Sequence, residues 1–190
     1  MILIAGLGNP GRDYILTRHN VGFIIVDRFI GKSDEIQKSR KFRSNTTYLN
    51  IKGRKVIVLK PLTFMNDSGS SLSMALKFFK DEISDILVIH DDIDLEFGIM
   101  KFKKGGGTAG HKGLESITRH LKDKNFDRLR FGVGRPPGQK DAADYVLKKF
   151  SSQELKELDI LCENASDSII DYIDNGIEYC MNKYNGLTSV

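Results

Sequence analysis

The strongest constraint on the fold is an uninterrupted apolar run near the start of the chain, at residues 2–7. A strand that is apolar at every position, and not only at alternate ones, is buried on both faces, as in the interior of a parallel sheet. A second short run of this kind, at residues 86–89, leads directly into His90, Asp91 and Asp92. Along the chain, strands alternate with helices, so the sequence predicts an α/β sandwich with a mostly parallel sheet.

The remaining elements follow from local patterns. Apolar residues at helical spacing follow Asn20, a good N-cap, and follow Asp67 or Ser68, either of which can cap the second helix. A further helix is expected at residues 111–121. Strands are expected at residues 40–51 and 55–60, joined by a turn at Lys52-Gly53-Arg54, and at residues 99–102 and 128–133. The hairpin makes the predicted sheet mixed.

The C-terminal part of the chain is predicted to be helical. Ser151 and Glu154 form a capping box that opens a helical region over residues 151–190, broken near Asn175-Gly176. No internal repeat is present, and no linker rich in Pro, Gly or Ser divides the chain. We therefore expect residues 1–190 to form a single domain.

Charge is unevenly spread along the chain, although the net charge is only +4. Residues 99–149 carry 13 Lys and Arg against 5 Asp and Glu, whereas residues 151–190 carry 2 against 8. A basic middle and an acidic tail indicate an anionic partner that binds the middle, with a solvated surface of chance asymmetry as the alternative.

Composition indicates a soluble cytoplasmic protein. The chain is 40% hydrophobic, and its longest apolar run is far shorter than the roughly 20 residues that span a membrane. The N-terminus has no basic region and no small-residue cleavage site, so we expect no signal peptide. Cys162 and Cys180 have no metal-site spacing and are interpreted as free thiols in a reducing cytosol.

A glycine-rich loop follows the first strand and matches the pattern G-x-G-x-x-G at residues 6–11. A dinucleotide site would need a helix to open at these glycines, so that its N-terminus faces a pyrophosphate. Here the helical pattern begins only at Val21, and no second strand ends in an acidic residue at the expected distance. A loop that presents Asn9 and His19 at the carboxyl end of a central strand is the better interpretation, because ligands of open α/β sheets bind there.

His19 and Asp91 are the candidates for catalysis. Asp91 follows a buried strand at its carboxyl end, and His19 lies in a polar loop just before a helix, so the sheet can bring them together. Such a pair is the minimal machinery of general-base hydrolysis, since the carboxylate orients the imidazole and the imidazole activates water. An exposed surface histidine is the alternative for His19.

Other kinds of catalytic site have weaker support. The sequence has no G-x-S-x-G elbow, and neither cysteine has a histidine nearby in sequence, which favours direct attack by water. A zinc site made of His90, Asp91 and His111 remains an alternative, although no close ligand pair supports it.

The segment from Lys60 to Gly69 joins a strand to a helix. Asn66 offers an amide donor and acceptor that could bind a peptide backbone or orient a water molecule. A helix cap is an equally good interpretation of Asn66. Phe64 and Met65 fit the core as well as a binding surface.

Several of these segments, in this order, closely resemble bacterial-type peptidyl-tRNA hydrolase. The resemblance covers the chain from Met1 to about Phe150, while the acidic C-terminal region adds little. The segments that carry it are Gly6-Leu7-Gly8-Asn9-Pro10-Gly11, Tyr14 with Thr17-Arg18-His19-Asn20-Val21-Gly22, Thr63-Phe64-Met65-Asn66-Asp67-Ser68-Gly69, His90-Asp91-Asp92 with Asp94-Leu95, the glycine segment from Gly105 to Leu114, and Asp144-Tyr145-Val146-Leu147.

The resemblance implies a single-domain α/β monomer of the phosphorylase/hydrolase-like kind, with a mixed twisted sheet and no metal or cofactor. Its implied activity is hydrolysis of the ester between a peptide and the terminal adenosine ribose of tRNA, which recycles tRNA from prematurely released peptidyl-tRNA in the cytoplasm.

The resemblance also implies roles for individual residues. His19 would be the catalytic base, with Asp91 as its orienting partner. The implied substrate ligands are Asn9, Asn66, Phe64 and Tyr14, and the implied contacts of the tRNA 5′-phosphate are Lys103 and Arg130, with Lys101 on the same strand face as Lys103.

One residue departs from the family pattern, which has Gly-His-Asn-Gly where this chain has Gly110-His111-Lys112-Gly113. The asparagine expected in place of Lys112 would bind substrate and position water. Lysine cannot accept a hydrogen bond, but it could contact a phosphate or carbonyl oxygen of the tRNA end.

Two other functions remain as alternatives. A non-catalytic RNA-binding relative would keep the basic strip but is expected to lose the base or its partner. A general hydrolase of small esters or amides would not need the basic surface.

Overall fold

The computed structural model describes residues 1–32 and 35–186. Its centre is one seven-stranded sheet with the order β2-β3-β4-β1-β5-β7-β6. The central strand β1 runs parallel to β4 and β5, and β5 runs parallel to β7, whereas β2, β3 and β6 pair antiparallel with their neighbours. The predicted mixed sheet with a parallel centre is therefore confirmed. The strands are β1 (Ile2–Gly6), β2 (Glu35–Lys41), β3 (Ser44–Ile51), β4 (Arg54–Pro61), β5 (Asp85–Asp92), β6 (Met100–Lys104) and β7 (Asp127–Gly132).

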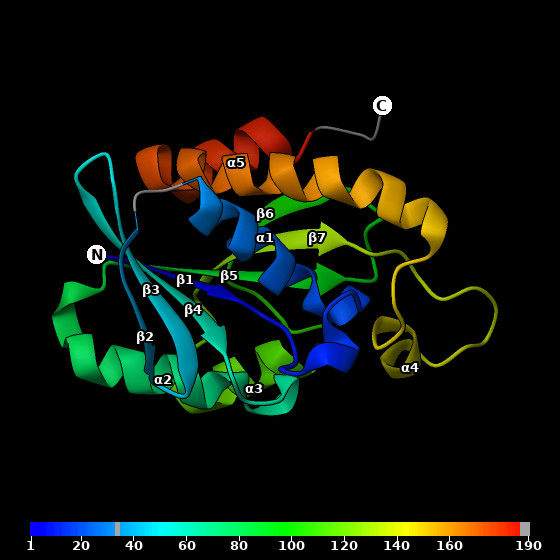
Figure 1. Cartoon of the computed structure of the whole chain (residues 1–190), viewed down its shortest axis with the longest axis horizontal. Coiled ribbons are helices and arrows are strands. Elements are labelled where there is room, and N and C mark those ends of the chain that lie inside the picture. Colours follow the sequence, from blue (N-terminus) through cyan, green and yellow to red (C-terminus); the bar gives the residue numbers. More distant parts are fainter. Residues whose placement is uncertain (33–34, 187–190) are drawn as a thin grey trace.

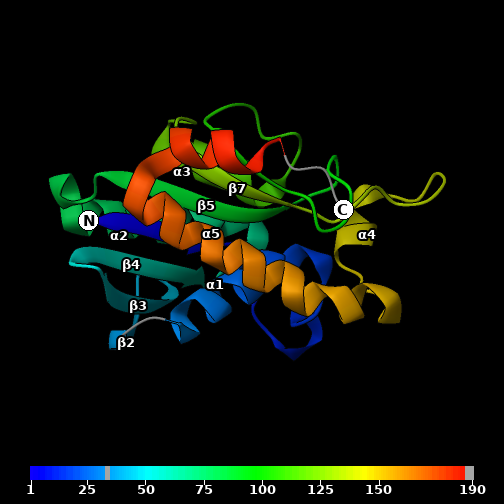
Figure 2. The ribbon, with the colours of Figure 1, turned by 90° about the horizontal axis from the view of Figure 1, so that it is seen from above.

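Helices cover both faces of the sheet, as the doubly buried strands predict. Helices α1 and α5 lie on one face, and α2 and α3 lie on the other (Figure 1). Seen from above, α5 extends along the sheet beside α1 (Figure 2). The helices are α1 (Val21–Gly31), α2 (Ser68–Phe79), α3 (Lys112–Leu121), α4 (Ala142–Val146) and α5 (Ser152–Tyr184), with short 3₁₀ helices η1 (Arg12–Tyr14), η2 (Arg18–Asn20), η3 (Met65–Asp67) and η4 (Lys80–Glu82).

Alternate residues of the central strands supply two separate cores. Ile2 and Ile4 of β1 face α1 and α5, while Leu3 and Ala5 face α2 and α3. All four are buried. This explains why β1 is apolar at every position. No helix in the described part of the chain has the length and apolar character needed to cross a bilayer.

The edge of the sheet differs from the prediction. We expected one strand over residues 40–51, but β2 ends at Lys41 and a tight turn at Phe42 and Arg43 leads into β3. Both turn residues have positive φ, 54° and 53°, as a two-residue hairpin turn requires. No glycine or asparagine marks this turn. The buried Phe42 side chain instead joins the core under α2, so the predicted single strand is wrong.

Two predicted helix caps are also wrong in detail. Asn20 stands at the N-cap of α1, and Asp67 at that of α2, but neither side chain caps its helix. The capping box of Ser151 and Glu154 at the start of α5 is confirmed, and so is the break near residue 176, where Gly176 has a φ of 79°.

Close backbone contacts place the loop of His19 at the carboxyl ends of β1 and β5. A Cβ atom added at Gly22 would lie 2.4 Å from the Ile89 carbonyl oxygen and 2.5 Å from the Leu7 backbone nitrogen. One added at Gly6 would lie 2.5 Å from the Gly22 carbonyl oxygen. Only glycine permits this approach, and it puts η2 next to the end of β5.

Candidate active site

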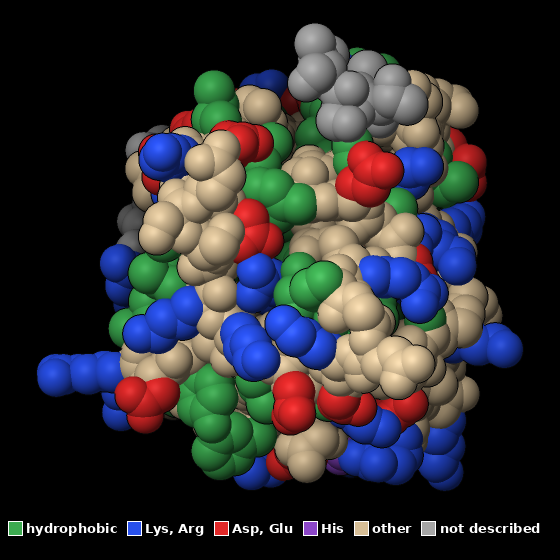
Figure 3. Space-filling view, turned by 90° about the vertical axis from the view of Figure 1, so that its right-hand side faces the viewer, with side chains coloured by type: hydrophobic (Ala, Val, Ile, Leu, Met, Phe, Trp, Pro, Cys, Tyr) green, Lys and Arg blue, Asp and Glu red, His purple; other side chains and the backbone are tan. Residues whose placement is uncertain are grey.

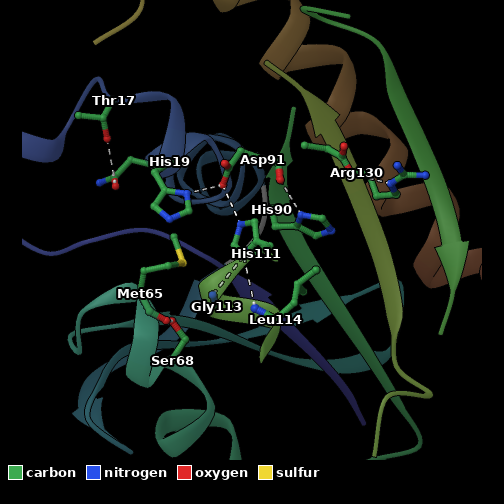
Figure 4. Close-up of polar contacts among 12 residues, drawn as sticks. Thr17, His19, Met65, Ser68, His90, Asp91, His111, Gly113, Leu114 and Arg130 are labelled. Atoms are coloured by element: carbon green, nitrogen blue, oxygen red, sulfur yellow. Dashed lines mark hydrogen bonds and ion pairs between the residues drawn. The ribbon is translucent and has the colours of Figure 1, made fainter. Parts of the chain in front are cut away.

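The predicted meeting of His19 and Asp91 is present. His19 lies in η2, and Asp91 lies near the carboxyl end of β5. His19 Nδ1 is 2.8 Å from Asp91 Oδ1. Both side chains are buried, at 10% and 2% exposed. The second ring nitrogen of His19, Nε2, points away from Asp91 (Figure 4). The alternative of an exposed surface histidine is therefore wrong.

Burial and pairing act in opposite directions on the pKa values of this pair. Burial by itself lowers the pKa of His19, but the attraction of Asp91 and its hydrogen bond outweigh burial and raise it above 6.5. Burial raises the pKa of Asp91, yet the attraction and hydrogen bonds of His19 and His111 bring it far below its usual 3.8. Asp91 is therefore a carboxylate throughout the physiological range.

His111 is a third member of this group that the sequence reasoning did not assign to catalysis. Its Nε2 lies 2.9 Å from the same Asp91 oxygen, Oδ1, that receives His19. Its Nδ1 accepts hydrogen bonds from the backbone nitrogens of Gly113 at 3.1 Å and Leu114 at 3.3 Å, so the ring caps α3. Figure 4 shows the two imidazoles approaching Asp91 from different sides. The available signals were its place at the start of the helix predicted at residues 111–121 and its place in the zinc alternative.

The three side chains also have the spacing of a metal site, because one ligand atom from each lies within 4.8 Å of the others. The ligand set of the zinc alternative is wrong, since His19 takes the place of His90. The hydrogen bonds oppose a metal at this position. A ring nitrogen that accepts from backbone N–H groups carries no proton, so the proton of His111 is on Nε2. That nitrogen is a donor to Asp91, and binding an ion there would require the cap to break.

His90 lies behind the pair and is uncharged. Its Nδ1 donates to the Asp91 backbone carbonyl at 2.7 Å. Burial and then the nearby His111 lower the pKa of His90 to about 3. The His90 ring lies 5.0 Å from the His111 ring, centroid to centroid. His90 is thus an uncharged side chain that lines the site.

Asn9 is fixed by its neighbours. The backbone nitrogen and oxygen of Asn9 both bind the Asn20 side chain, at 2.9 Å each. The Asn9 side-chain oxygen accepts from the Met65 backbone nitrogen at 2.8 Å. The Asn9 amide nitrogen is therefore the end left for the cleft. Asn20 holds the glycine-rich loop in place of capping α1, which is why the predicted cap bond is missing.

These residues line a cleft of about 620 Å³. Tyr14 and Phe64 stand on its walls with their rings 6.4 Å apart, edge to face, and Phe64 is 59% exposed. Asn66 is exposed in the cleft wall within η3, and Met65 is buried beneath it. The N-cap of α2 is Asp67, so Asn66 does not cap that helix.

The cationic residues of β6 and β7 lie on one face of the sheet. Lys101 pairs with Arg130 across the strands, and Lys103 pairs with Arg128. Lys103, Arg128 and Arg130 line the cleft, while Lys101 lies beside them outside it. The end of the molecule that bears α4 carries Lys and Arg side chains across its middle (Figure 3).

Arg128 is a residue that the sequence reasoning missed. Its guanidinium is buried, and it donates to the carbonyl oxygens of Gly106 and Gly107, at 2.6 Å each. Arg128 thus fixes the second glycine segment, at Gly106 and Gly107, beside the cleft. Arg130 instead donates from Nε to Asp92 Oδ2 at 2.8 Å. Sequence distance hides these contacts, since Arg128 lies 21 and 22 residues from its two partners and Arg130 lies 38 residues from Asp92.

Lys112, the residue that departs from the family pattern, is the first residue of α3 and lines the cleft. Its side chain is 64% exposed, and Nζ lies 3.2 Å from Glu115 Oε2. A cation at a helix N-terminus faces the positive end of the helix dipole. Helix stability therefore does not explain the lysine.

A mixed α/β sheet that presents a paired imidazole and carboxylate to a cleft is typical of a hydrolase, and fold and site together indicate this class. The model of one family, described as peptidyl-tRNA hydrolase, matches residues 3–189. The chain therefore belongs to the peptidyl-tRNA hydrolase family, and it is an enzyme that hydrolyses the ester bond of peptidyl-tRNA.

Similar proteins agree with this assignment. A peptidyl-tRNA hydrolase of Thermoanaerobacter sp. (strain X514) is 46% identical over 186 residues, which cover 98% of this chain and 100% of that protein. One of Frankia casuarinae is 42% identical, with 97% and 94% covered. A crystal structure of peptidyl-tRNA hydrolase from Acinetobacter baumannii has a TM-score of 0.89 and 35% identity, and the match covers 99% of this chain and 96% of that one. The family match extends beyond Phe150, where we expected the resemblance to end, and includes α5.

Proposed function

We propose that this enzyme cleaves the ester between the carboxyl end of a peptide and the ribose of the 3′-terminal adenosine of tRNA, with His19 as the general base. The products are free tRNA and free peptide. The observation that carries this proposal is the buried bond between His19 Nδ1 and Asp91 Oδ1, which leaves His19 Nε2 as the proton acceptor in the cleft.

In the proposed mechanism a water molecule attacks the ester carbonyl carbon while His19 Nε2 takes its proton. Asp91 keeps the imidazole in the Nδ1–H tautomer and stabilises the imidazolium that forms. The tetrahedral intermediate then collapses, the bond to the ribose oxygen breaks, and His19 returns the proton to that oxygen. General-base assistance of this kind contributes about 10²–10⁴-fold to the rate.

The developing oxyanion needs hydrogen-bond donors that are fixed before the reaction. The Asn9 side-chain amide nitrogen is one candidate, because the oxygen of the same group is already bound to Met65. The backbone N–H groups of the loop from Gly105 to Gly110, held by Arg128, are the others. Asn66, which is exposed in the cleft wall, would bind the substrate.

For the tRNA, we propose that Lys103 and Arg130 bind its 5′-phosphate and that Lys101 extends this surface. Their shared sheet face beside the cleft supports the assignment. Tyr14 and Phe64 at the cleft wall offer aromatic surface to the terminal nucleotide, since bases stack on exposed aromatic rings. The cellular role would be to recycle tRNA from prematurely released peptidyl-tRNA in the cytoplasm, and the enzyme would act as a monomer without metal or cofactor.

His19→Ala tests the base directly. We expect it to reduce the turnover of peptidyl-tRNA by at least about 10²-fold, with little change in tRNA binding or in melting temperature. His120→Ala is the matched control, because this histidine lies in the last turn of α3, outside the cleft lining. Near-normal turnover by the His19 variant would exclude it as the base.

A second comparison tests the substrate class. Hydrolysis of a short peptidyl ester is measured beside hydrolysis of full peptidyl-tRNA. We expect strong preference for the tRNA-linked substrate, since the cationic face binds only the latter. Equal efficiency on the two would favour a general ester hydrolase, and no hydrolysis of either would favour a non-catalytic RNA-binding protein.

A further inference from the structure

His111 is tied to two parts of the molecule at the same time. Its Nδ1 accepts from the Gly113 and Leu114 backbone nitrogens at the start of α3, and its Nε2 reaches Asp91 Oδ1 at 2.9 Å. Helix N-caps are usually Ser, Thr, Asp or Asn, whose oxygens accept from these nitrogens. Histidine can do so only through an unprotonated ring nitrogen.

The cap therefore decides where the proton of His111 resides. A proton on Nδ1 would point at two backbone N–H groups, so the ring is held as the Nε2–H tautomer. Nε2–H then donates to Asp91 Oδ1. The same oxygen also receives Nδ1–H of His19 at 2.8 Å. One carboxylate oxygen thus has two imidazole donors, and only one of these imidazoles has a free nitrogen toward the cleft.

We propose that His111 is a positioning residue for the reaction. The start of α3 fixes the tautomer of His111, and the Nε2–H of His111 holds Asp91 in place and weakens the attraction of Asp91 for protonated His19. This inference rests on the proposed role of His19 as base. A carboxylate that already receives a neutral donor attracts the His19 imidazolium less strongly. His111 thereby keeps His19 from binding its proton too tightly to work as a base near neutral pH.

Among the residues that the structure describes, few other charged groups act on His19. The first turn of α1, from Val21 to Ile24, contains no titratable side chain. Arg18, its neighbour in η2, is directed toward Glu154, 2.6 Å away. In α4, Asp144 is exposed and the Tyr145 hydroxyl donates to the Val133 carbonyl oxygen. Asp91 and the Nε2–H of His111 that donates to it are therefore the main determinants of the affinity of His19 for a proton.

A purely structural role predicts something different. If His111 only caps α3, a substitution that keeps the cap should leave the pH profile unchanged. Asn is such a substitution, because its side-chain oxygen is among the best N-caps. It is too short to keep the bond to Asp91. His111→Asn thus separates the cap from the donor, whereas His111→Ala removes both.

The first experiment measures kcat and KM for peptidyl-tRNA across pH, together with melting temperature, for His111→Asn, His111→Ala and the control His120→Asn. We expect His111→Asn to lower kcat on the order of tenfold, to leave KM within about twofold, and to move the acid limb of kcat/KM to higher pH. Its melting temperature should exceed that of His111→Ala. His120→Asn should match the wild type in kcat and in the acid limb.

A second measurement needs no activity. Long-range ¹H–¹⁵N NMR spectra of protein with ¹⁵N-labelled histidine distinguish the Nε2–H tautomer from the Nδ1–H tautomer and from imidazolium. At the pH of the activity assay we expect the Nε2–H tautomer of His111, because its Nδ1 accepts from two backbone nitrogens. The Nδ1–H tautomer at that pH would overturn the proposal.

The remaining outcomes are also decisive. An unmoved acid limb in His111→Asn, or an unchanged kcat, refutes the positioning role and leaves His111 as a cap alone. Such a result leaves the proposed function intact, because that proposal fails only if His19→Ala retains turnover.

Discussion

At the residue scale, histidines that look alike in sequence differ because of their partners. His19 is paired with a carboxylate, so its pKa is raised, whereas His90 donates to a carbonyl in a buried wall and has its pKa lowered to about 3. His111 accepts from a helix N-terminus and donates to Asp91. The chemistry of each ring is thus set by the atoms that its two nitrogens contact.

The raised pKa of His19 predicts opposite pH trends in activity and in stability. The base that we propose must be unprotonated to act, so kcat/KM should rise through a midpoint above 6.5. The bond to Asp91 stabilises charged His19 in the folded state. Its contribution is fully present below the unfolded pKa and is lost as pH rises through the higher folded pKa.

We therefore expect the free energy of unfolding to fall with pH in the window where activity rises. Denaturant titrations of wild type and His19→Gln between about pH 6 and pH 9 isolate this term as the difference between the two proteins. A difference that stays constant with pH would contradict the raised pKa.

Lys112 leads to a second prediction at this scale. The side chain lies exposed at the cleft beside the start of α3, where it can contact an anionic group but cannot accept a hydrogen bond from water. We propose that it preserves binding and weakens the positioning of water. Lys112→Asn should then raise kcat with KM unchanged or higher. An unchanged rate would discard this role.

At the element scale, tight backbone positions decide how the elements join. Gly22 lets η2 and α1 approach the ends of β1 and β5, and Phe42 with Arg43 turns β2 into β3. The break in α5 is of the same kind, since Gly176 combines a φ of 79° with a ψ of −178°. This conformation is essentially restricted to glycine.

Gly176→Ala should therefore destabilise the fold by about 1–3 kcal/mol through backbone strain alone. No atom within 4 Å would meet the new methyl group. The break lies beside Ile2 and Asp85, at the strand ends opposite the active site, so activity per folded molecule should not change. Gly31→Ala is the matched control, because that glycine is helical and equally open. Equal denaturation midpoints for the two variants would argue against strain at residue 176.

At the scale of the whole molecule, the order of the strands in the sheet brings the residues of the candidate site together. The carboxyl ends of β1 and β5 carry the loop of His19 and Asp91, and β7 and β6 add the cationic face at the same side of the cleft. The acidic C-terminal region lies in α5 on the other face of the sheet (Figure 1). The charge asymmetry of the sequence thus becomes a division between two faces.

This arrangement predicts how salt affects the reaction. Lys103→Ala and Arg130→Ala should each raise KM at low salt and reduce the slope of log KM against log salt by about one, because each would remove one of the proposed contacts with a tRNA phosphate. Lys52→Ala is a suitable control, since this exposed lysine lies in the turn between β3 and β4 and pairs with Asp174. If KM is unchanged in both variants, the anionic partner binds elsewhere.

Local patterns in the sequence determined the α/β class, the mixed sheet, the break in α5 and the proximity of His19 to Asp91. Apolar periodicity and strand ends are properties of neighbouring residues, so they can be read without coordinates. Only the tertiary structure revealed that His19 and His111 share one oxygen of Asp91, that Arg128 binds the carbonyl oxygen of Gly107, and that Asn9 and Asn20 are hydrogen-bonded. These contacts join residues 11 to 72 positions apart, and only the packed sheet fixes the distances between such side chains.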